Sequence, residues 1–159
     1  GMLLRFLRAK AFDSPASLAM VEEHLAWRAE HGVDSILDER PEDILGCDPR
    51  IIRHYLPTLS EGVDRQGRPL QWGKQGAMKM DEILKHTTRA KLLRGHIWEQ
   101  ENLMRRFRES AQERGCLVCH AVTITDFAHF SPGLASREAL GLMRDMAAMD
   151  AAHYPDRQG

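Results

Sequence analysis

The sequence has little of what marks several classes of protein. Only three cysteines occur in 159 residues, an odd number that does not build a disulfide framework, so we expect a reducing, cytoplasmic environment. Seven prolines and twelve glycines are too few for a low-complexity chain. No apolar run approaches the ~20 residues that cross a bilayer, so no membrane-spanning segment is predicted.

An excess of charge of one sign is also missing. The chain carries 22 Lys and Arg against 23 Asp and Glu, a formal net charge of −1. Because a nucleic-acid partner is usually held by a cationic field, no nucleic-acid partner is predicted. Hydrophobic residues make up 43% of the chain and charged residues 28%, which is typical of a globular protein that buries a core.

Helical signals fill the first part of the chain. Residues 3–12 have the pattern of a short amphipathic helix in which Leu3 and Phe6 share a face that excludes Arg5. Asp13-Ser14-Pro15 then combines a capping side chain with Pro at the first turn, which predicts the start of a second helix.

The second helix is expected to end at Gly32. Leu18, Val21 and Leu25 follow one another at helical spacing, so we predict that they form its buried stripe.

Strand signals begin in the middle of the chain. Turn residues at 63–69 predict a hairpin, and residues 70–73 the strand after it. A long helix is predicted over residues 88–114, with Ile97 and Phe107 on its buried side.

The last elements are a strand and a helix. Residues 117–125 are β-branched and nearly all apolar, which predicts a central strand covered on both faces. The final helix is expected over residues 136–152, with Leu140, Met143 and Ala147 on its buried stripe.

Several sequence blocks, in their order and spacing, resemble the CRAL-TRIO lipid-binding family. More narrowly, they resemble its phosphatidylinositol/phosphatidylcholine transfer branch. The blocks are Leu3 to Ala9 followed by Lys10, then Trp27-Arg28, Asp64 to Pro69, Trp98-Glu99 with Glu101, Ile124 to Asp126, and His153 to Arg157.

The resemblance implies an α/β fold with two parts. Residues 1–45 correspond to the N-terminal helical region. Residues 46–159 correspond to the first half of a three-layer α/β/α lipid-binding domain. We expect the domain to be incomplete, because the family's later strands and its gating helix correspond to sequence beyond Gly159.

The same resemblance implies lipid binding and transfer between membranes, most plausibly of a phosphatidylinositol-type phospholipid. The expected partners are a phospholipid or another hydrophobic ligand and, transiently, a membrane surface to which the protein is peripheral. Neither an enzymatic activity nor a cofactor is expected. An incomplete domain would also leave a sheet edge unpaired, which predicts poor transfer by this chain alone and self-association.

Three residues occupy positions that bind lipid in the family. Lys10 stands where that branch has an Arg that meets the lipid phosphate, and Thr123 matches a Thr that helps to hold the phosphatidylcholine headgroup. Ala121 replaces a Ser beside it. Ser60 and Gln100 replace tyrosines that surround choline in the relative, so an inositol lipid or an apolar ligand is favoured over phosphatidylcholine.

Two alternatives stay open. One is a regulatory or protein-interaction module that has lost the pocket and does not transfer lipid. The other is a small thiol or hydrolytic enzyme that uses Cys116, Cys119, His120 or Asp126. If Cys116 and Cys119 lie in a strand, they point to opposite faces, so they are not expected to bind a metal together.

Overall fold

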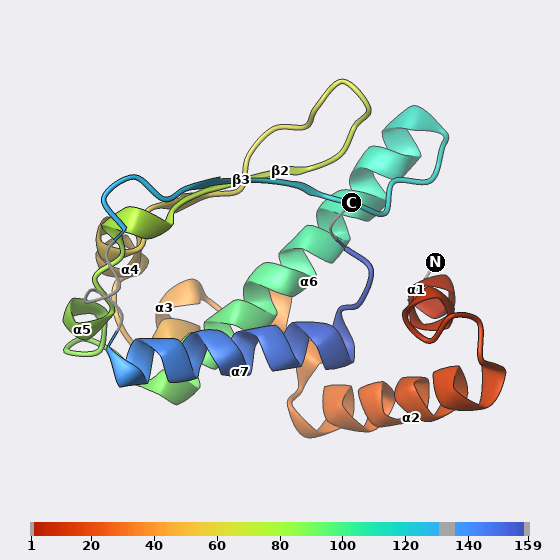
Figure 1. Ribbon diagram of the computed structural model, residues 1–159, viewed down its shortest axis with the longest axis horizontal. Coiled ribbons are helices and arrows are strands. Elements are labelled where there is room, and N and C mark those ends of the chain that lie inside the picture. The colour runs from red at the N-terminus through yellow and green to blue at the C-terminus, as the bar shows by residue number, and fades with distance from the viewer. Residues whose placement is uncertain (1, 131–135, 158–159) are drawn as a thin grey trace.

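The computed structural model describes residues 2–130 and 136–157. Within them, a small sheet lies over two long helices, and shorter helices lie around the ends (Figure 1). In chain order the elements are α1 (Met2–Ala9), α2 (Ser14–Glu30), η1 (Val33–Asp38), α3 (Pro41–Leu45), α4 (Pro49–Tyr55), β1 (Thr58–Leu59), β2 (Leu70–Lys74), η2 (Gln75–Ala77), α5 (Met80–Ile83), α6 (Arg89–Arg114), β3 (Val122–Asp126) and α7 (Arg137–His153). The predicted α/β class is confirmed.

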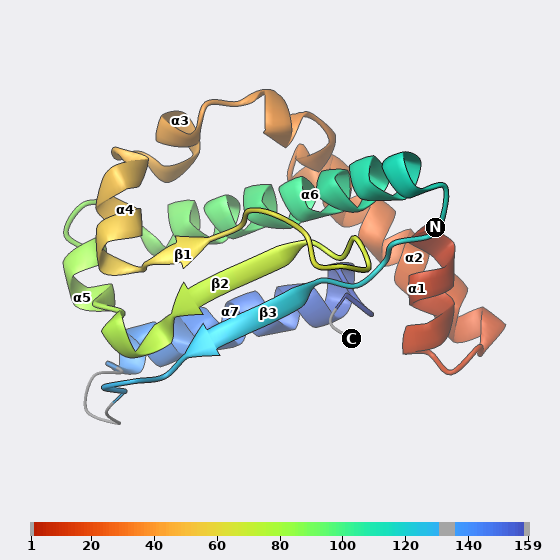
Figure 2. The same ribbon diagram turned by 90° about the horizontal axis from the view of Figure 1, so that it is seen from above.

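The sheet has the strand order β1-β2-β3. β1 pairs antiparallel with β2, whereas β2 and β3 run parallel, from the pair Leu70–Val122 to the pair Lys74–Asp126. Parallel neighbours need a crossover connection, which here contains α6. Figure 2 shows β2 and β3 pointing the same way, with α7 behind them.

At four helix starts, a short polar residue precedes the helix and caps its first turn with its side chain. The side chains of Asp13, Asp48, Thr88 and Ser136 accept hydrogen bonds from the backbone N–H groups of Ala16, Arg50, Lys91 and Ala139, respectively. Each bond satisfies one of the free N–H groups of a first turn. The helix starts predicted at Asp13 and Thr88 are therefore confirmed.

The predicted hairpin turn before β2 is also confirmed. The Asp64 carboxylate accepts bonds from the N–H groups of Gln66 and Arg68 at 2.8 and 2.9 Å. Gly67 has φ +80°, a conformation that favours glycine, and its carbonyl accepts a 2.6 Å bond from the Ser110 hydroxyl. The turn is thereby attached to the last part of α6.

The strand predicted at residues 117–125 is shorter and lies elsewhere in the sheet than expected. β3 begins at Val122, and in the described chain it pairs only with β2. Thr123 and Ile124, which point to opposite faces, are both exposed. Val118 and Ala121 pack instead against α6, and this contact draws the segment before β3 out of the ladder. The prediction of a central strand covered on both faces is wrong for the described residues.

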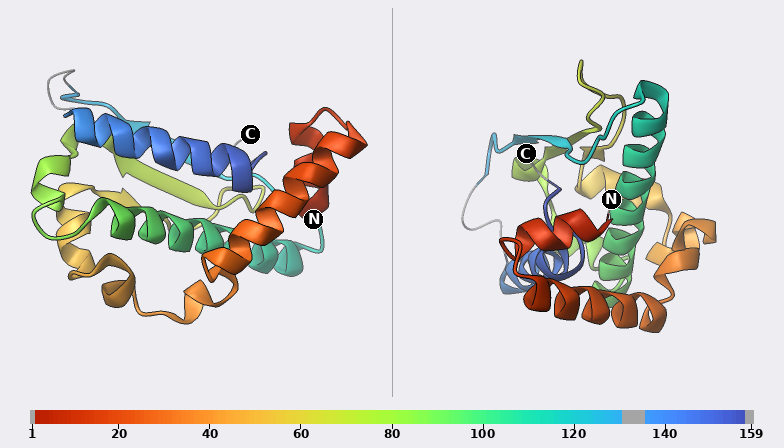
Figure 3. Two further views of the ribbon diagram at one scale, coloured as in Figure 1. Left: turned by 90° about the horizontal axis from the view of Figure 1, so that it is seen from below. Right: turned by 90° about the vertical axis from the view of Figure 1, so that its right-hand side faces the viewer.

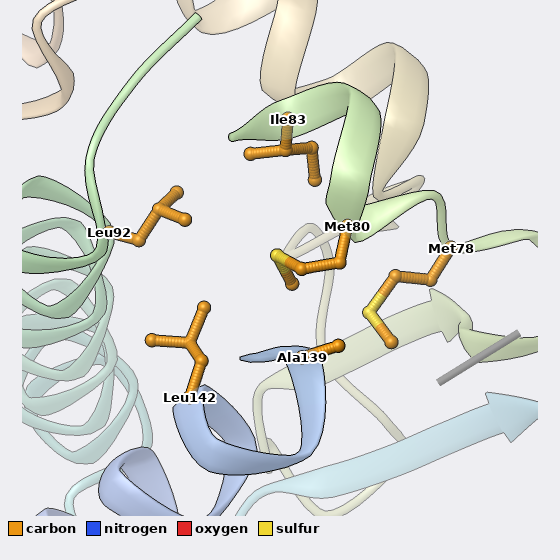
Figure 4. Close-up of a cluster of buried hydrophobic side chains, with 6 residues drawn as sticks. All are labelled: Met78, Met80, Ile83, Leu92, Ala139 and Leu142. Atoms are coloured by element: carbon orange, nitrogen blue, oxygen red, sulfur yellow. The ribbon is translucent and has the colours of Figure 1, made fainter. Parts of the chain in front are cut away.

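The buried stripe predicted for α7 is wrong by one residue. Ala139 and Leu142 are buried, whereas Leu140 and Met143 are 55% and 42% exposed. Because Ala139, Leu142 and Met146 repeat at the same helical spacing, the sequence has two apolar stripes and periodicity cannot choose between them. Packing against α6 selects the stripe that carries Ala139 (Figure 4).

The stripe predicted for α2 is correct only at Val21. Leu18 and Leu25 are exposed, and Ser17 and His24 are buried in their place. The His24 ring packs within aromatic contact distance of rings on α1, α2 and α7, so this contact, and not the leucine spacing, decides which face turns inward.

In α1, Phe6 is buried as predicted, but the other two predictions for this helix are wrong. Leu3 is exposed, and Arg5 turns inward. The Arg5 guanidinium carbon lies 4.9 Å from the centre of the Phe107 ring on α6. A cation over an aromatic face is attracted to it, and the long Arg stem covers apolar surface, which explains why a charged residue joins this contact.

Three apolar clusters hold the layers together. The first joins the segment after η2 to α5, α6 and α7 (Figure 4). It consists of Met78, Met80, Ile83, Leu92, Ala139 and Leu142. The second consists of Val33, Ile36, Ile44 and Ile97, and the third of Leu103, Phe107, Val118 and Ala121. All three clusters include α6, which is therefore the central element of the core, and Ile97 and Phe107 are buried as predicted.

Candidate functional site

Lys10 lies just beyond the C-terminal end of α1. Its backbone N–H lies within hydrogen-bond distance of the carbonyls of Phe6 and Leu7, which closes the last turn. The side chain is exposed and makes no hydrogen bond or ion pair within residues 2–130 and 136–157. Ala11 and Phe12 follow at φ +49° and +64°, a strained conformation for both residues that turns the chain sharply toward α2.

Ala121 and Thr123 lie on one face of the chain at the start of β3 but differ in burial. Ala121 is 4% exposed, packs against Leu103 and Phe107, and donates its N–H to the Arg157 carbonyl at 2.9 Å. Thr123 is exposed and faces solvent. A ligand therefore has access to the Thr123 hydroxyl but not to the Ala121 methyl group.

The structure brings α1 to this end of β3, although it does not join Lys10 to either residue. Arg5 donates to the Cys119 carbonyl at 3.4 Å, and Arg8 pairs with Asp156 at 3.1 Å. Lys10 makes no bond to Ala121 or Thr123 in the described chain. Lys10 therefore follows a helix that contacts Cys119, two residues before Ala121, but Lys10 itself does not contact the other two predicted site residues.

Positive charge gathers where α1 meets the C-terminal segment. The hydrogen bond that Arg8 donates to Asp156 raises the pKa of Arg8, whereas burial lowers the pKa of Arg5. His120 lies 3.6 Å from the same Asp156 carboxylate. With Lys10 unpaired, this end of the molecule offers a positive charge to an anion.

A buried polar network is the feature that sequence reasoning missed. Glu101 on α6 is 6% exposed and accepts bonds from Arg28 at 2.8 Å and from the Tyr154 hydroxyl at 2.9 Å. Burial and the Glu101 charge raise the pKa of Tyr154, so its hydroxyl stays protonated and donates. Arg157 donates to the Tyr154 carbonyl and pairs with Asp150 at 3.0 Å.

This network explains several blocks that carry the family resemblance. Trp27 and Arg28 come from α2, Glu101 from α6, and Tyr154 and Arg157 from the segment after α7, yet they meet in one place. In the sequence, the signal for this network was that these residues occur together in the blocks that resemble the family. Their hydrogen bonds and ring contacts join α2, α6 and the end of α7. Figure 3 shows α2 crossing the other two helices.

The residues of the enzyme alternative have ordinary structural surroundings. The Asp126 carboxylate accepts the Ala128 N–H at 2.8 Å and so caps the turn after β3. Cys116 and Cys119 are free thiols that precede β3, so the prediction that they lie in a strand is wrong. Among the described residues, no group of three or more His, Cys, Asp or Glu side chains is arranged to hold a metal ion.

No helix in the described chain is long and apolar enough to cross a bilayer.

The fold and the network define a mixed α/β protein whose helical N-terminal part is joined to a small sheet domain. No family model matches the chain. Curated proteins do match: the SEC14 cytosolic factor of Eremothecium gossypii is 35% identical over 158 residues, which is 99% of this chain and 50% of that protein. A CRAL-TRIO domain-containing protein of Saccharomyces cerevisiae is 32% identical over 161 residues, 99% of this chain and 51% of that protein.

A phosphatidylinositol/phosphatidylcholine transfer protein of Arabidopsis thaliana is 30% identical over 155 residues, 97% of this chain and 26% of that protein. The chain is therefore homologous over nearly its whole length to SEC14 and CRAL-TRIO proteins, and the predicted resemblance is confirmed. It spans about half the length of the fungal relatives named here.

Proposed function

We propose that the chain binds a phospholipid as part of a protein that transfers lipid between membranes. The observation that carries this proposal is its similarity, over 97–99% of its length, to SEC14 and to the plant phosphatidylinositol/phosphatidylcholine transfer proteins. In this proposal residues 1–45 form the helical region and residues 46–159 contribute to the lipid-binding domain. The protein acts in the cytoplasm, peripheral to membranes, without catalysing a reaction.

The proposed ligand is a phosphatidylinositol-type phospholipid. Lys10 is exposed and unpaired in the described chain, so its ammonium is available to a lipid phosphate. Thr123 offers an exposed hydroxyl close to the same end of the molecule, whereas Ala121, two residues before it, is buried against α6 and does not contact the ligand in this proposal.

Choline is the less suitable headgroup because a quaternary ammonium binds best to aromatic faces. Ser60 accepts a 2.6 Å bond from Arg106, and Gln100 is buried beside His96 and Asp150. Neither position offers an aromatic ring. This supports selectivity for an inositol headgroup.

The test measures uptake of labelled phosphatidylinositol from donor vesicles, with labelled diacylglycerol as the neutral comparison. Lys10→Ala should weaken uptake of phosphatidylinositol by more than tenfold, since a hydrogen bond to a charged group contributes about 1.5–3 kcal/mol. Uptake of the neutral lipid should not change. Lys79→Ala, at an exposed lysine distant from α1, is the matched control. An equal loss for both lipids, or no loss with Lys10→Ala, would contradict the proposed headgroup contact.

The second candidate function is a protein-interaction module, and the exposed β3 strand favours it. In the described chain β3 pairs on one side only, and its Ile124 is 51% exposed. An open strand edge with an apolar side chain recruits another strand. Light scattering after size-exclusion chromatography should show a dimer or larger species that Ile124→Lys converts to monomer, while Leu25→Lys does not. A monomeric wild-type protein would remove this candidate.

A further inference from the structure

Two exposed phenylalanines lie in the turn that follows β3. Phe127 and Phe130 are 60% and 46% exposed, and their rings make an edge-to-face pair with centroids 5.9 Å apart. The Phe130 N–H donates to the Phe127 carbonyl at 2.9 Å, and the Asp126 carboxylate caps the turn. The turn is therefore ordered by its own hydrogen bonds while it presents two aromatic rings to solvent.

The body of the protein holds this turn in place. At Gly76 in η2, an added Cβ atom would lie 1.9 Å from the Ala128 carbonyl oxygen, so the turn lies directly against the glycine backbone. This close approach fixes the turn to the C-terminal end of β2. The turn that carries the exposed rings is therefore packed against η2.

A cationic and apolar surface lies on the first half of α7. Arg137, Leu140, Gly141 and Arg144 line a hollow of about 470 Å3. At 100° per residue these positions share the side of α7 opposite the buried Ala139 and Leu142.

The acidic residues of this half-helix lie to one flank of that surface. Asp145 pairs there with Arg89 of α6, and Glu138 projects from the same flank. Arg137 and Arg144 are exposed, and neither pairs with a carboxylate in the part of the chain that the structure describes. The outer face of the helix therefore keeps two positive charges around Leu140.

These two features lie at the same end of the molecule. In Figure 2 the turn after β3 and the first turn of α7 both lie beyond the tip of the β3 arrow; Figure 1 shows them at the same end of the molecule but in different layers, the turn with the sheet and α7 below it. We propose that Phe127, Phe130, Arg137, Leu140 and Arg144, here called the Phe–Arg surface, dock onto a bilayer that contains anionic phospholipid. This inference rests on the proposed lipid-transfer function, because it names the surface that meets the membrane.

The composition of the Phe–Arg surface favours a membrane over a second copy of the chain. Phe and Leu side chains insert at the boundary between headgroups and acyl chains, and arginines around them attract anionic headgroups. A symmetric contact between two copies would bring Arg137 and Arg144 against the same arginines, and like charges repel. An anionic bilayer attracts the two arginines and also takes up the apolar side chains.

Vesicle co-sedimentation of the full chain tests the inference. The wild-type protein should bind vesicles of 30% phosphatidylserine in phosphatidylcholine, and bind pure phosphatidylcholine vesicles about tenfold or more weakly. Arg137→Gln with Arg144→Gln should weaken binding to the anionic vesicles by more than tenfold, since each arginine at such a surface contributes about 1 kcal/mol, or about fivefold. Phe127→Ser with Phe130→Ser should weaken binding to both kinds of vesicle.

The control pair is Arg108→Gln with Leu25→Ser, which removes one exposed arginine from the last part of α6 and one exposed leucine from α2, at the other end of the molecule. Thermal unfolding checks that every variant is folded. If the wild type does not bind anionic vesicles, or if the Phe–Arg variants bind like the control, the inference is wrong. It is also wrong if the variants change only the oligomeric state, because the surface then binds a second copy. Phospholipid loading, measured separately, fails only if the proposed function fails.

Discussion

At the scale of single residues, Glu101 is the acceptor on which the contact between α2, α6 and the C-terminal segment depends. It receives both Arg28 and the Tyr154 hydroxyl while almost wholly buried. A buried carboxylate is tolerated only when cations and hydrogen-bond donors surround it. These residues are therefore better explained by folding than by contact with a lipid.

Tyr154→Phe removes one donor to this buried carboxylate and keeps the ring. We expect the free energy of unfolding to fall by about 2 kcal/mol, the usual size for a hydrogen bond to a charged group, as measured by urea denaturation. Tyr55→Phe is the control, because in the described chain the Tyr55 hydroxyl has no hydrogen bond. Equal effects of the two substitutions would show that the Glu101 bond does not stabilise the fold.

At the scale of elements, the sequence predicts boundaries better than faces. Helix starts at Asp13 and Thr88 and the turn at Gly67 depend on local hydrogen bonds or backbone angles, which the nearby residues determine. Which side of α7 is buried depends on a distant helix, and Leu140 and Leu142 are equally apolar. Local pattern alone therefore does not decide it.

The candidate site was predicted to a smaller extent than the fold. Lys10, Ala121 and Thr123 came from family resemblance, and the structure brings α1 near β3 without joining Lys10 to the other two. The Glu101 network and the exposed Phe127–Phe130 pair depend on contacts between segments far apart in sequence. No periodicity in one segment indicates such contacts.

The contact between η2 and the turn after β3 gives a test at this scale. Gly76→Ala should lower the free energy of unfolding by about 3 kcal/mol or prevent folding, because the new Cβ meets the backbone of Ala128, which cannot move without displacing the turn. Thermal unfolding measures the effect. Gly141→Ala is the control: its Cβ meets only the end of the flexible Arg89 side chain, and alanine favours helix over glycine by about 1 kcal/mol. A Gly76→Ala protein as stable as wild type would contradict the close approach.

At the scale of the whole molecule, the helical N-terminal part is held to the rest by rings as well as by ions. His24 is 3% exposed and lies 5.1 Å from the Phe6 ring and 5.6 Å from the His153 ring, measured between centroids. Trp27 stacks on His153 at 3.9 Å. These contacts join α1, α2 and α7 (Figure 3).

Acid should weaken this junction. Burial, with the charge of Arg28 next, lowers the pKa of His24 to about 4, below its ordinary 6.5. Between pH 6.5 and about 4, His24 therefore binds a proton in the unfolded chain but not in the folded chain. Stability is unaffected above pH 6.5 and falls between pH 6.5 and about 4, by up to about 1.4 kcal/mol per pH unit.

Urea denaturation at pH 7 and pH 5 measures this dependence. His24→Phe should reduce the loss of stability between the two pH values, since phenylalanine takes up no proton and fits an aromatic cluster. The exposed His86→Gln should leave the loss unchanged. If His24→Phe and His86→Gln behave alike, His24 is not the group that responds to acid.

Native mass spectrometry of the protein purified from cells tests the proposed phospholipid binding most directly. We expect a species heavier than the bare chain by the mass of one phospholipid, with an inositol headgroup fragment on dissociation. We also expect that incubation with phosphatidylinositol vesicles increases this species. A protein that is lipid-free as purified, and that remains lipid-free after incubation with those vesicles, would contradict the proposal.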